Sequence, residues 1–186
     1  MKGIIVFKGK YGATQQYAGW LAEELQLPVV NAEEIAPDKL RGFDFVILAG
    51  SVYIGKWMLR DWLRANLNIL RRKKIFAMIV CGTPASNRSE QTSLAKNNIP
   101  VVLCDQVETF FLPGRLVIRK LSWFDRFMLK MGARLQKDST VRERMLCDVD
   151  NVSRENLDDA IRRIKSYQFS KYASSRVWRY KMVSEN

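Results

Sequence analysis

The stretch Lys8-Gly9-Lys10-Tyr11-Gly12-Ala13-Thr14 decides the fold, because of what lies on either side of it. It follows an apolar run at residues 4–7 and precedes a helical pattern over about residues 13–26. A glycine-containing turn from strand to helix points backbone N–H groups and a helix N-terminus at one spot, which suits a phosphate group. The hydroxyl of Thr14 adds a further donor. The stretch matches neither the P-loop nor the G-x-G-x-x-G fingerprint, so it predicts a phosphate-binding loop of another kind.

Apolar strands and helical patterns alternate along the chain on both sides of this loop. We expect strands at residues 3–7, 28–30, 43–49, 75–80 and 107–112. We expect helices at residues 13–26, 56–70, 88–97 and 153–169, the last with Ser153 as its N-cap. The near-continuous apolar run at residues 43–49 is typical of a strand buried on both faces. The pattern predicts an α/β fold, a doubly wound five-stranded parallel sheet with helices on both faces.

The length and composition indicate one cytoplasmic domain. The 186 residues are 47% hydrophobic, which is enough for a single sizeable core. We expect this domain to span residues 1–169 and residues 170–186 to form a basic, mobile tail. The N-terminus enters a strand directly, and no apolar run is long enough to span a bilayer. The three cysteines are scattered without a C-x-x-C motif, so we expect reduced thiols.

The charge balance and the absence of histidine limit the chemistry. Lys and Arg number 31 against 19 Asp and Glu, and the net charge of +12 implies an anionic partner. The chain contains no His, which excludes His-based triads, His metal sites and His proton shuttles. We therefore expect no metal site, and we expect any redox chemistry to come from a bound cofactor.

Three glycine-containing segments fall where parallel strands end, at the edge where doubly wound sheets bind ligands. They are the loop described above, Ser51-Val52-Tyr53-Ile54-Gly55 after the third strand, and Cys81-Gly82-Thr83 after the fourth. Glycines let the backbone approach a flat ring closely, and Tyr53 and Trp57 are candidates to stack on it. The plainer alternative is that the glycines only form turns and the aromatic rings only pack. Together the three segments favour FMN as the cofactor.

A segment of about residues 114–143, between the fifth strand and the last helix, is longer than the fold requires. Residues 115–137 contain seven Lys and Arg and one acidic residue. At helical spacing one face carries Leu121, Phe124, Met128, Met131 and Leu135, and the opposite face carries Arg126, Lys130, Arg134 and Lys137. The apolar stripe alone favours packing on the sheet. The basic side, flanked by Trp123 and Phe127, favours an anionic membrane surface over a merely solvated face.

Specific motifs in this chain resemble those of the flavodoxin-type, menaquinone-dependent protoporphyrinogen oxidase family. The strongest is Trp123-Phe124-Asp125-Arg126-Phe127-Met128, and Gly12-x-Thr14 and Ser51-x-x-x-Gly55 match the family's FMN loops. The resemblance runs from Ile4 to about Ile164. It implies a flavodoxin-like fold with one FMN, a helical insertion after strand five, and two-electron oxidation of a substrate with electrons passed to a quinone. The family's named substrate is protoporphyrinogen IX, in haem synthesis.

The resemblance also implies an anionic small-molecule substrate. Its propionates would be attracted to Arg115, Arg119 or Lys120. With Trp123, Arg126, Phe127 and Lys130, these residues form the candidate set for substrate or membrane contact. The sequence nominates no catalytic acid or base. The family loop opens with hydroxyl residues where this chain has Lys8-Gly9, and Lys8 or Lys10 is expected to supply charge in their place.

Two other classes of function stay open. One is a generic FMN electron-transfer or quinone-reductase protein without porphyrinogen activity. The other is a flavin-free basic binding protein, supported by the net charge and by the basic run at residues 176–181. No nucleic-acid motif is present, so we expect no nucleic-acid partner. Peripheral contact with the inner face of the cell membrane and the oligomeric state are both left open by the sequence.

Overall fold

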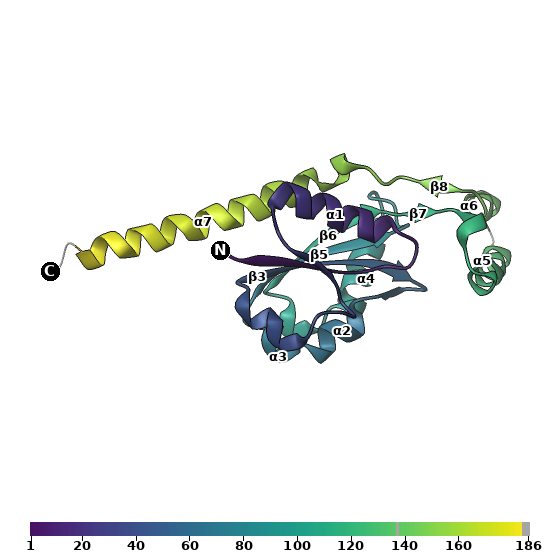
Figure 1. Ribbon diagram of the computed structural model, residues 1–186. Helices are drawn as coiled ribbons and strands as arrows, with labels where there is room; N and C mark the ends of the chain where they lie inside the picture. Colours follow the sequence, from purple (N-terminus) through teal and green to yellow (C-terminus); the bar gives the residue numbers. More distant parts are fainter. Residues whose placement is uncertain (137, 184–186) are drawn as a thin grey trace.

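The computed structural model describes residues 1–136 and 138–183, and a parallel sheet forms its centre (Figure 1). The strands run in the order β2-β1-β3-β5-β6. Their bounds are β1 Gly3–Lys8, β2 Val29–Asn31, β3 Phe45–Tyr53, β5 Lys74–Cys81 and β6 Val107–Pro113. A short strand β4, Lys56–Trp57, folds back antiparallel on β3. The predicted doubly wound five-stranded parallel sheet is confirmed.

Helices cover both faces of the sheet (Figure 1). One face is covered by α1, Ala13–Leu25, and by the start of α7, Asp158–Val183. The other face is covered by α2, Arg60–Ala65, α3, Leu67–Leu70, and α4, Arg88–Asn98.

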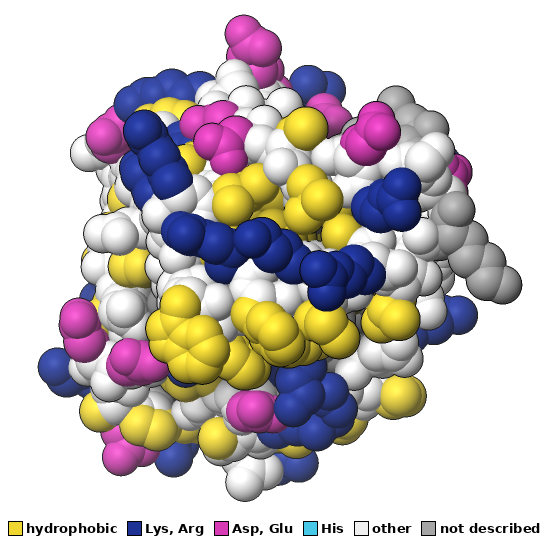
Figure 2. Space-filling view, turned by 90° about the vertical axis from the view of Figure 1, so that its right-hand side faces the viewer, with side chains coloured by type: hydrophobic (Ala, Val, Ile, Leu, Met, Phe, Trp, Pro, Cys, Tyr) yellow, Lys and Arg dark blue, Asp and Glu magenta, His cyan; other side chains and the backbone are white. Residues whose placement is uncertain are grey.

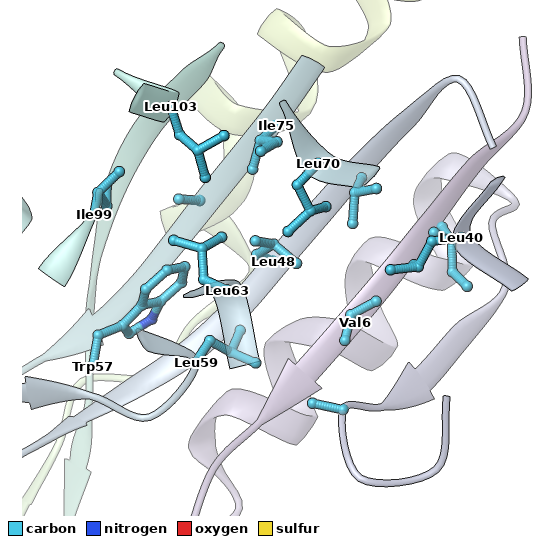
Figure 3. Close-up of a cluster of buried hydrophobic side chains, with 14 of the residues drawn as sticks. Val6, Leu40, Leu48, Trp57, Leu59, Leu63, Leu70, Ile75, Ile99 and Leu103 are labelled. Carbon is cyan, nitrogen blue, oxygen red and sulfur yellow. The ribbon is translucent and has the colours of Figure 1, made fainter. Parts of the chain in front are cut away.

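The core on the α2–α4 side is made of aliphatic side chains around one tryptophan (Figure 3). Val6 and Leu48 project from neighbouring strands and pack with Leu63 and Leu70, all of them fully buried. Burial of each such side chain stabilises the fold by about 1.5–3 kcal/mol. Because the strands are apolar on both faces, this packing holds β1, β3 and β5 in register and aligns their carboxyl ends at one edge.

Two expectations about helices differ from the structure. The segment at residues 56–70 is not one helix, because β4 occupies its first two residues and the helical part is divided at Asn66, whose side-chain amide donates to the carbonyl of Trp62. The last helix is preceded by a 3₁₀ turn, Arg154–Leu157, and Ser153 makes no side-chain capping bond to the described residues. Ser153 therefore lies just before the 3₁₀ turn, but its side chain does not cap that turn.

The backbone of α7 continues to Val183, so the expected boundary at residue 169 is not the end of a helix. Side chains from residue 171 onward, including the basic run at residues 176–181, lie outside what the structure describes, as do residues 184–186 entirely. None of the described helices is long and apolar enough to cross a bilayer.

The segment between β6 and α7 forms a separate projection (Figure 1). It leaves through β7, Arg115–Leu116, and returns through β8, Val149–Asp150, which pairs antiparallel with β7. Between these strands lie α5, Trp123–Leu135, and α6, Ser139–Met145. The stem is reinforced by an ion pair of 2.7 Å between Arg115 Nε and Asp150 Oδ2.

Candidate functional site

The loop after β1 ends at an α1 N-terminus that no side chain of the described residues caps. Gly12 stands at the N-cap position with a φ of 86°, a conformation that glycine adopts without steric cost. Thr14 is 1% exposed, and its Oγ1 has no hydrogen-bond partner among the described residues. A buried hydroxyl without a partner is costly. The loop therefore offers an unused hydroxyl beside free helix N–H groups, which is the donor set that a phosphate requires.

Gly9 is required by the same loop for packing. A Cβ at this position would lie 2.7 Å from the Cβ of Thr14. Any larger residue would therefore push Thr14 and the start of α1 away, so Gly9 keeps the hydroxyl at its buried position.

Both lysines of the loop are engaged with carboxylates. Lys8 Nζ lies 3.1 Å from Glu33 Oε1, and Lys10 Nζ lies 2.6 Å from Asp125 Oδ2. Each lysine therefore has a carboxylate partner, and the expectation that one of them supplies charge at the phosphate loop stays a prediction. The hydrogen bond with Asp125 raises the pKa of Lys10 above its ordinary value, so this ammonium stays charged.

The second loop is a tight hairpin turn from β3 to β4. Ile54 has a φ of 48° and Gly55 a φ of 70°, so both central residues are left-handed. A β-branched residue rarely adopts this conformation, and backbone strain of this kind concentrates at functional sites. The side chain of Ile54 is 65% exposed. The hydroxyl of Ser51 donates a hydrogen bond to the sulfur of Met58 at 3.1 Å, and this bond links the start of the loop to the residue that follows β4.

Trp57 belongs to the core and not to the site. It is 1% exposed, and its indole Nε1 donates to the carbonyl of Gly50 at 2.9 Å (Figure 3). A Cβ on Gly50 would lie 2.3 Å from that nitrogen. The expectation that Trp57 stacks on a ring ligand is therefore wrong, and Gly50 serves the packing of Trp57. Tyr53 remains at the site.

The third loop follows β5. Cys81 is buried, and this burial raises the pKa of its thiol above the ordinary value. Gly82 is exposed, and a Cβ there would meet nothing within 4 Å. Thr83 Oγ1 donates to Glu90 at 3.0 Å, which ties this loop to α4.

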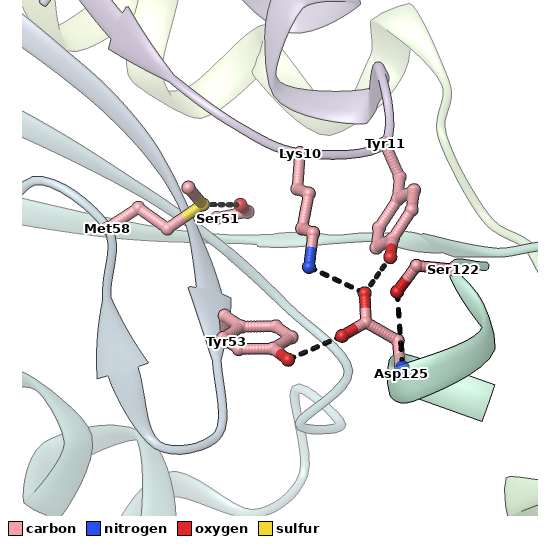
Figure 4. Close-up of polar contacts among 7 residues, drawn as sticks. All are labelled: Lys10, Tyr11, Ser51, Tyr53, Met58, Ser122 and Asp125. Carbon is pink, nitrogen blue, oxygen red and sulfur yellow. Dashed lines mark hydrogen bonds and ion pairs between the residues drawn. The ribbon is translucent and has the colours of Figure 1, made fainter. Parts of the chain in front are cut away.

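Asp125 joins the projecting segment to the first two loops (Figure 4). Its carboxylate is held by Lys10, by the hydroxyl of Tyr11 and by the hydroxyl of Tyr53. Lys10 Nζ also lies 4.6 Å from the centre of the Tyr53 ring. Asp125 is only 6% exposed, and its backbone N–H is capped by the hydroxyl of Ser122. Asp125 thus accepts bonds from Lys10 and Tyr11, which lie more than 110 positions away along the chain, and from Tyr53, which lies 72 positions away.

This role of Asp125 was not predicted from the sequence, where the residue appeared only as part of the motif at residues 123–128. A signal was present, because Asp125, Leu129 and Ala133 recur at a spacing of four and so share one side of α5, the side on which Asp125 and Ala133 are buried. A charged residue on the inner side of a helix indicates a buried partner.

The proposed substrate-binding cations are not brought together as one free cluster. Arg115 is bound to Asp150 and donates to Gln16 Oε1 at 2.9 Å, so it ties the stem to α1. Arg119 and Lys120 are exposed, and the carbonyl of Arg119 accepts a bond from Arg126.

The apolar stripe of α5 does not pack on the sheet, which contradicts the plainer expectation. Its inner side carries Asp125 and Ala133, whereas its aromatic and methionine side chains lie on the outside. Of the predicted stripe, Leu121 is buried, whereas Phe124, Met128, Met131 and Leu135 are exposed, and Trp123 and Phe127 beside them are exposed too.

Comparisons with known proteins agree with this fold. A family model described as "Flavodoxin domain" matches residues 4–143. The chain is 23% identical over 150 residues to protoporphyrinogen IX dehydrogenase [quinone] of Escherichia coli K12, covering 75% of this chain and 83% of that protein.

Among solved structures, the chain matches a Megasphaera elsdenii flavodoxin with a TM-score of 0.46, 12% identity, and coverage of 60% of this chain and 85% of that one. It matches an archaeal flavodoxin with a TM-score of 0.40, 14% identity, and coverage of 61% and 85%. The family model spans well over half of the residues, so the chain belongs to the flavodoxin domain family.

Proposed function

We propose that this protein binds FMN in the three loops and is an oxidoreductase. The observation that carries the proposal is the buried hydroxyl of Thr14, which has no hydrogen-bond partner among the described residues, beside an α1 N-terminus that none of their side chains caps. This donor set fits a dianionic phosphate, because aligned backbone N–H groups and a hydroxyl can all donate to it. The fit is local to the loop after β1, which Gly9 and Gly12 shape.

Bound FMN would supply reversible two-electron chemistry. The chain's own residues bind and orient it. Thr14 and the first N–H groups of α1 would hold the phosphate of FMN. The loops at residues 51–55 and 81–83 lie at the ends of β3 and β5 and would border the rest of the FMN molecule. The thiol of Cys81 stays protonated at neutral pH because its pKa is raised, so it does not act as a nucleophile there.

The proposal for the substrate and the acceptor is supported by a relative that is similar over most of the chain. That relative is named a protoporphyrinogen IX dehydrogenase with quinone. We propose a reduced, anionic small molecule as the substrate, with protoporphyrinogen IX as the candidate, and a quinone as the acceptor. The reaction balances when electrons and protons leave the substrate in pairs and reduce the quinone to its quinol.

A second candidate is an FMN protein that transfers electrons without porphyrinogen activity. It is favoured by the engagement of Arg115, Lys8 and Lys10 with carboxylates, which leaves fewer cations for a porphyrinogen's propionates. Both candidates require bound FMN and differ only in the substrate.

The first test is FMN retention by the protein and by Thr14→Val. We expect the purified protein to keep flavin absorbance after incubation with FMN and desalting. We expect Thr14→Val to bind FMN at least tenfold more weakly, since a hydrogen bond to a charged group contributes about 1.5–3 kcal/mol. The free variant should be no less stable than the wild type, because it loses a buried hydroxyl that has no partner in the described part of the chain.

Thr92→Val is the matched control. Thr92 is exposed on α4, and its hydroxyl bonds only to the carbonyl of Arg88 among the described residues. A protein that never retains flavin would refute the proposal, and unchanged retention by Thr14→Val would refute the role of Thr14. Oxidation of protoporphyrinogen IX with a soluble menaquinone analogue by the flavin-loaded protein then separates the two candidates.

A further inference from the structure

The outer side of α5 exposes more large apolar side chains than is usual for a helix that faces only water. Trp123 is 81% exposed, Leu135 is 79% exposed and Phe127 is 54% exposed. Phe124, Met128 and Met131 complete the same surface, which we call the α5 outer face. A contiguous group of large apolar side chains on the surface marks an interaction site.

Basic side chains border this surface. Arg126, Lys130 and Arg134 follow one another along α5 at a spacing of four residues, and Arg119 and Lys120 are exposed just before the helix. Figure 2 shows Lys and Arg side chains in a row across this side of the molecule, with hydrophobic side chains on both sides of the row. Arg126, Lys130 and Arg134 form no ion pair with any carboxylate among residues 1–136 and 138–183. The only acidic residue of α5 is Asp125, which is buried.

Contacts on the inner side of α5 fix the orientation of this helix. Asp125 and Ala133 are buried on its inner side, and Asp125 is bound by Lys10, Tyr11 and Tyr53. Rotating the helix to hide its apolar side would expose Ala133 and pull a carboxylate from three donors. The outward direction of the aromatic rings is therefore a consequence of the Asp125 contacts.

We infer that the α5 outer face docks on a lipid bilayer that carries anionic headgroups. An amphipathic helix lies in the interface plane with its apolar side among the acyl chains, and its Lys and Arg contact the headgroups. Trp123 and Phe127 are the side-chain types that settle at such an interface. A nucleic acid would satisfy the cations and leave the six apolar side chains in water. A second copy of the chain is disfavoured, because each copy has a net charge of +12.

Docking in this orientation would place the site against the lipid. Asp125 contacts the loops after β1 and β3, so the carboxyl edge of the sheet lies directly behind α5. A quinone is an apolar molecule that dissolves in the bilayer. Resting on the proposed function, the α5 outer face would bring the flavin site to the compartment that holds its acceptor.

The experiment is sedimentation of the full chain with vesicles, without FMN or substrate. Vesicles of phosphatidylcholine alone are compared with vesicles that also contain phosphatidylglycerol. We expect binding only to the latter, with loss at high salt. Lys130→Glu with Arg134→Glu should weaken binding by more than about fivefold for each charge, since one basic residue near an anionic surface accounts for about that factor. Phe127→Ser with Met131→Ser should weaken it by at least tenfold through lost apolar burial.

The matched controls lie away from α5. Val101 and Val102 are exposed apolar residues before β6, and Lys96 is an exposed base on α4. Val101→Ser with Val102→Ser, and Lys96→Glu, should bind as the wild type does. Trp123 fluorescence should shift to shorter wavelength with vesicles, and Trp123→Phe should abolish that shift.

Three outcomes would overturn the inference. The first is equal binding to both vesicle types, and the second is unchanged binding by both α5 double variants. The third is a solution mass that doubles as the protein concentration rises, together with a monomeric mass for Phe127→Ser with Met131→Ser. The last would assign the surface to a second copy. Because no flavin is present, a failure here is separate from a failure of FMN retention.

Discussion

At the scale of single residues, Asp125 decides where the projecting segment rests. Its carboxylate is almost fully enclosed, and its donors come from two loops that are themselves far apart in sequence. One side chain therefore fixes the distance between α5 and the candidate flavin site. Local sequence patterns do not identify the partners in such a long-range contact, because helical spacing shows only which residues share a side of α5 and not what that side contacts.

We expect Asp125→Asn to loosen α5 without unfolding the sheet. The amide keeps an acceptor for one tyrosine but loses the ion pair with Lys10, which should cost about 1–3 kcal/mol. Backbone amides of α5 should exchange with deuterium faster, and those of β3 and β5 should be unchanged. Asp105→Asn, at an exposed turn, is the control. Unchanged exchange in α5 would mean that other contacts hold the helix.

Ile54 offers a second residue-scale prediction, since its left-handed backbone is unfavourable for a β-branched side chain. Ile54→Asn should raise the free energy of unfolding by about 1 kcal/mol, because asparagine tolerates this conformation. Urea unfolding of the apo protein measures the change. Ile54→Val keeps the branch at Cβ and should give no gain. A loss of stability in Ile54→Asn would show that the exposed side chain packs on something that compensates for the strain.

At the scale of elements, the strands and the helices α1 and α4 were predicted closely, whereas the single helix expected at residues 56–70 was not found. The parallel strands begin and end within about two residues of their predicted bounds, except β3, which runs on to Tyr53. A near-continuous apolar run of this length is typical of a strand that is buried on both faces, so its bounds can be predicted from the sequence. Residues 56–70 have helical spacing throughout, yet the turn at Ile54-Gly55 sends Lys56–Trp57 back along β3. The apolar spacing of α5 was also read correctly as helical, but spacing alone cannot tell an inner side from an outer one.

A pH-dependent link joins β6 to α7. Glu108 accepts a bond of 2.6 Å from Arg163 and lies 3.0 Å from Lys74 Nζ. Burial alone would raise the pKa of Glu108, but hydrogen bonds from Arg163 and Lys74 outweigh it and hold the pKa below 4.5. The unfolded chain then binds the proton at a higher pH than the folded one. The stabilisation is therefore present above about pH 4.5 and lost as the pH falls through the folded pKa.

We expect the free energy of unfolding of Glu108→Gln to decline less on acidification than that of the wild type. Urea unfolding at a series of pH values from neutral to about pH 3 covers the window. The exposed Glu34→Gln serves as the control. Parallel curves for wild type and Glu108→Gln would rule out this link.

At the scale of the whole molecule, the alternation of strands and helices predicted the sheet and both helical layers. It also placed the three loops at one edge, since parallel strands leave their carboxyl ends together. The direction of the α5 outer face and the closure by Asp125 could not be predicted, because both depend on how a projecting segment folds back on distant loops. The net charge indicated an anionic partner, and the structure adds that part of it lies in a row beside apolar side chains.

The antiparallel pairing of β7 with β8 has an evolutionary consequence. Arg115 lies opposite Asp150, so the chain enters and leaves the projecting segment at points about 5 Å apart. A tight turn or a pair of helices can close the same stem, and the entropy of closure grows only slowly with length. The length and surface of the segment between them can therefore change without moving the strands of the central sheet. Insertions and deletions within this segment should destabilise the protein less than changes in β1, β3 or β5.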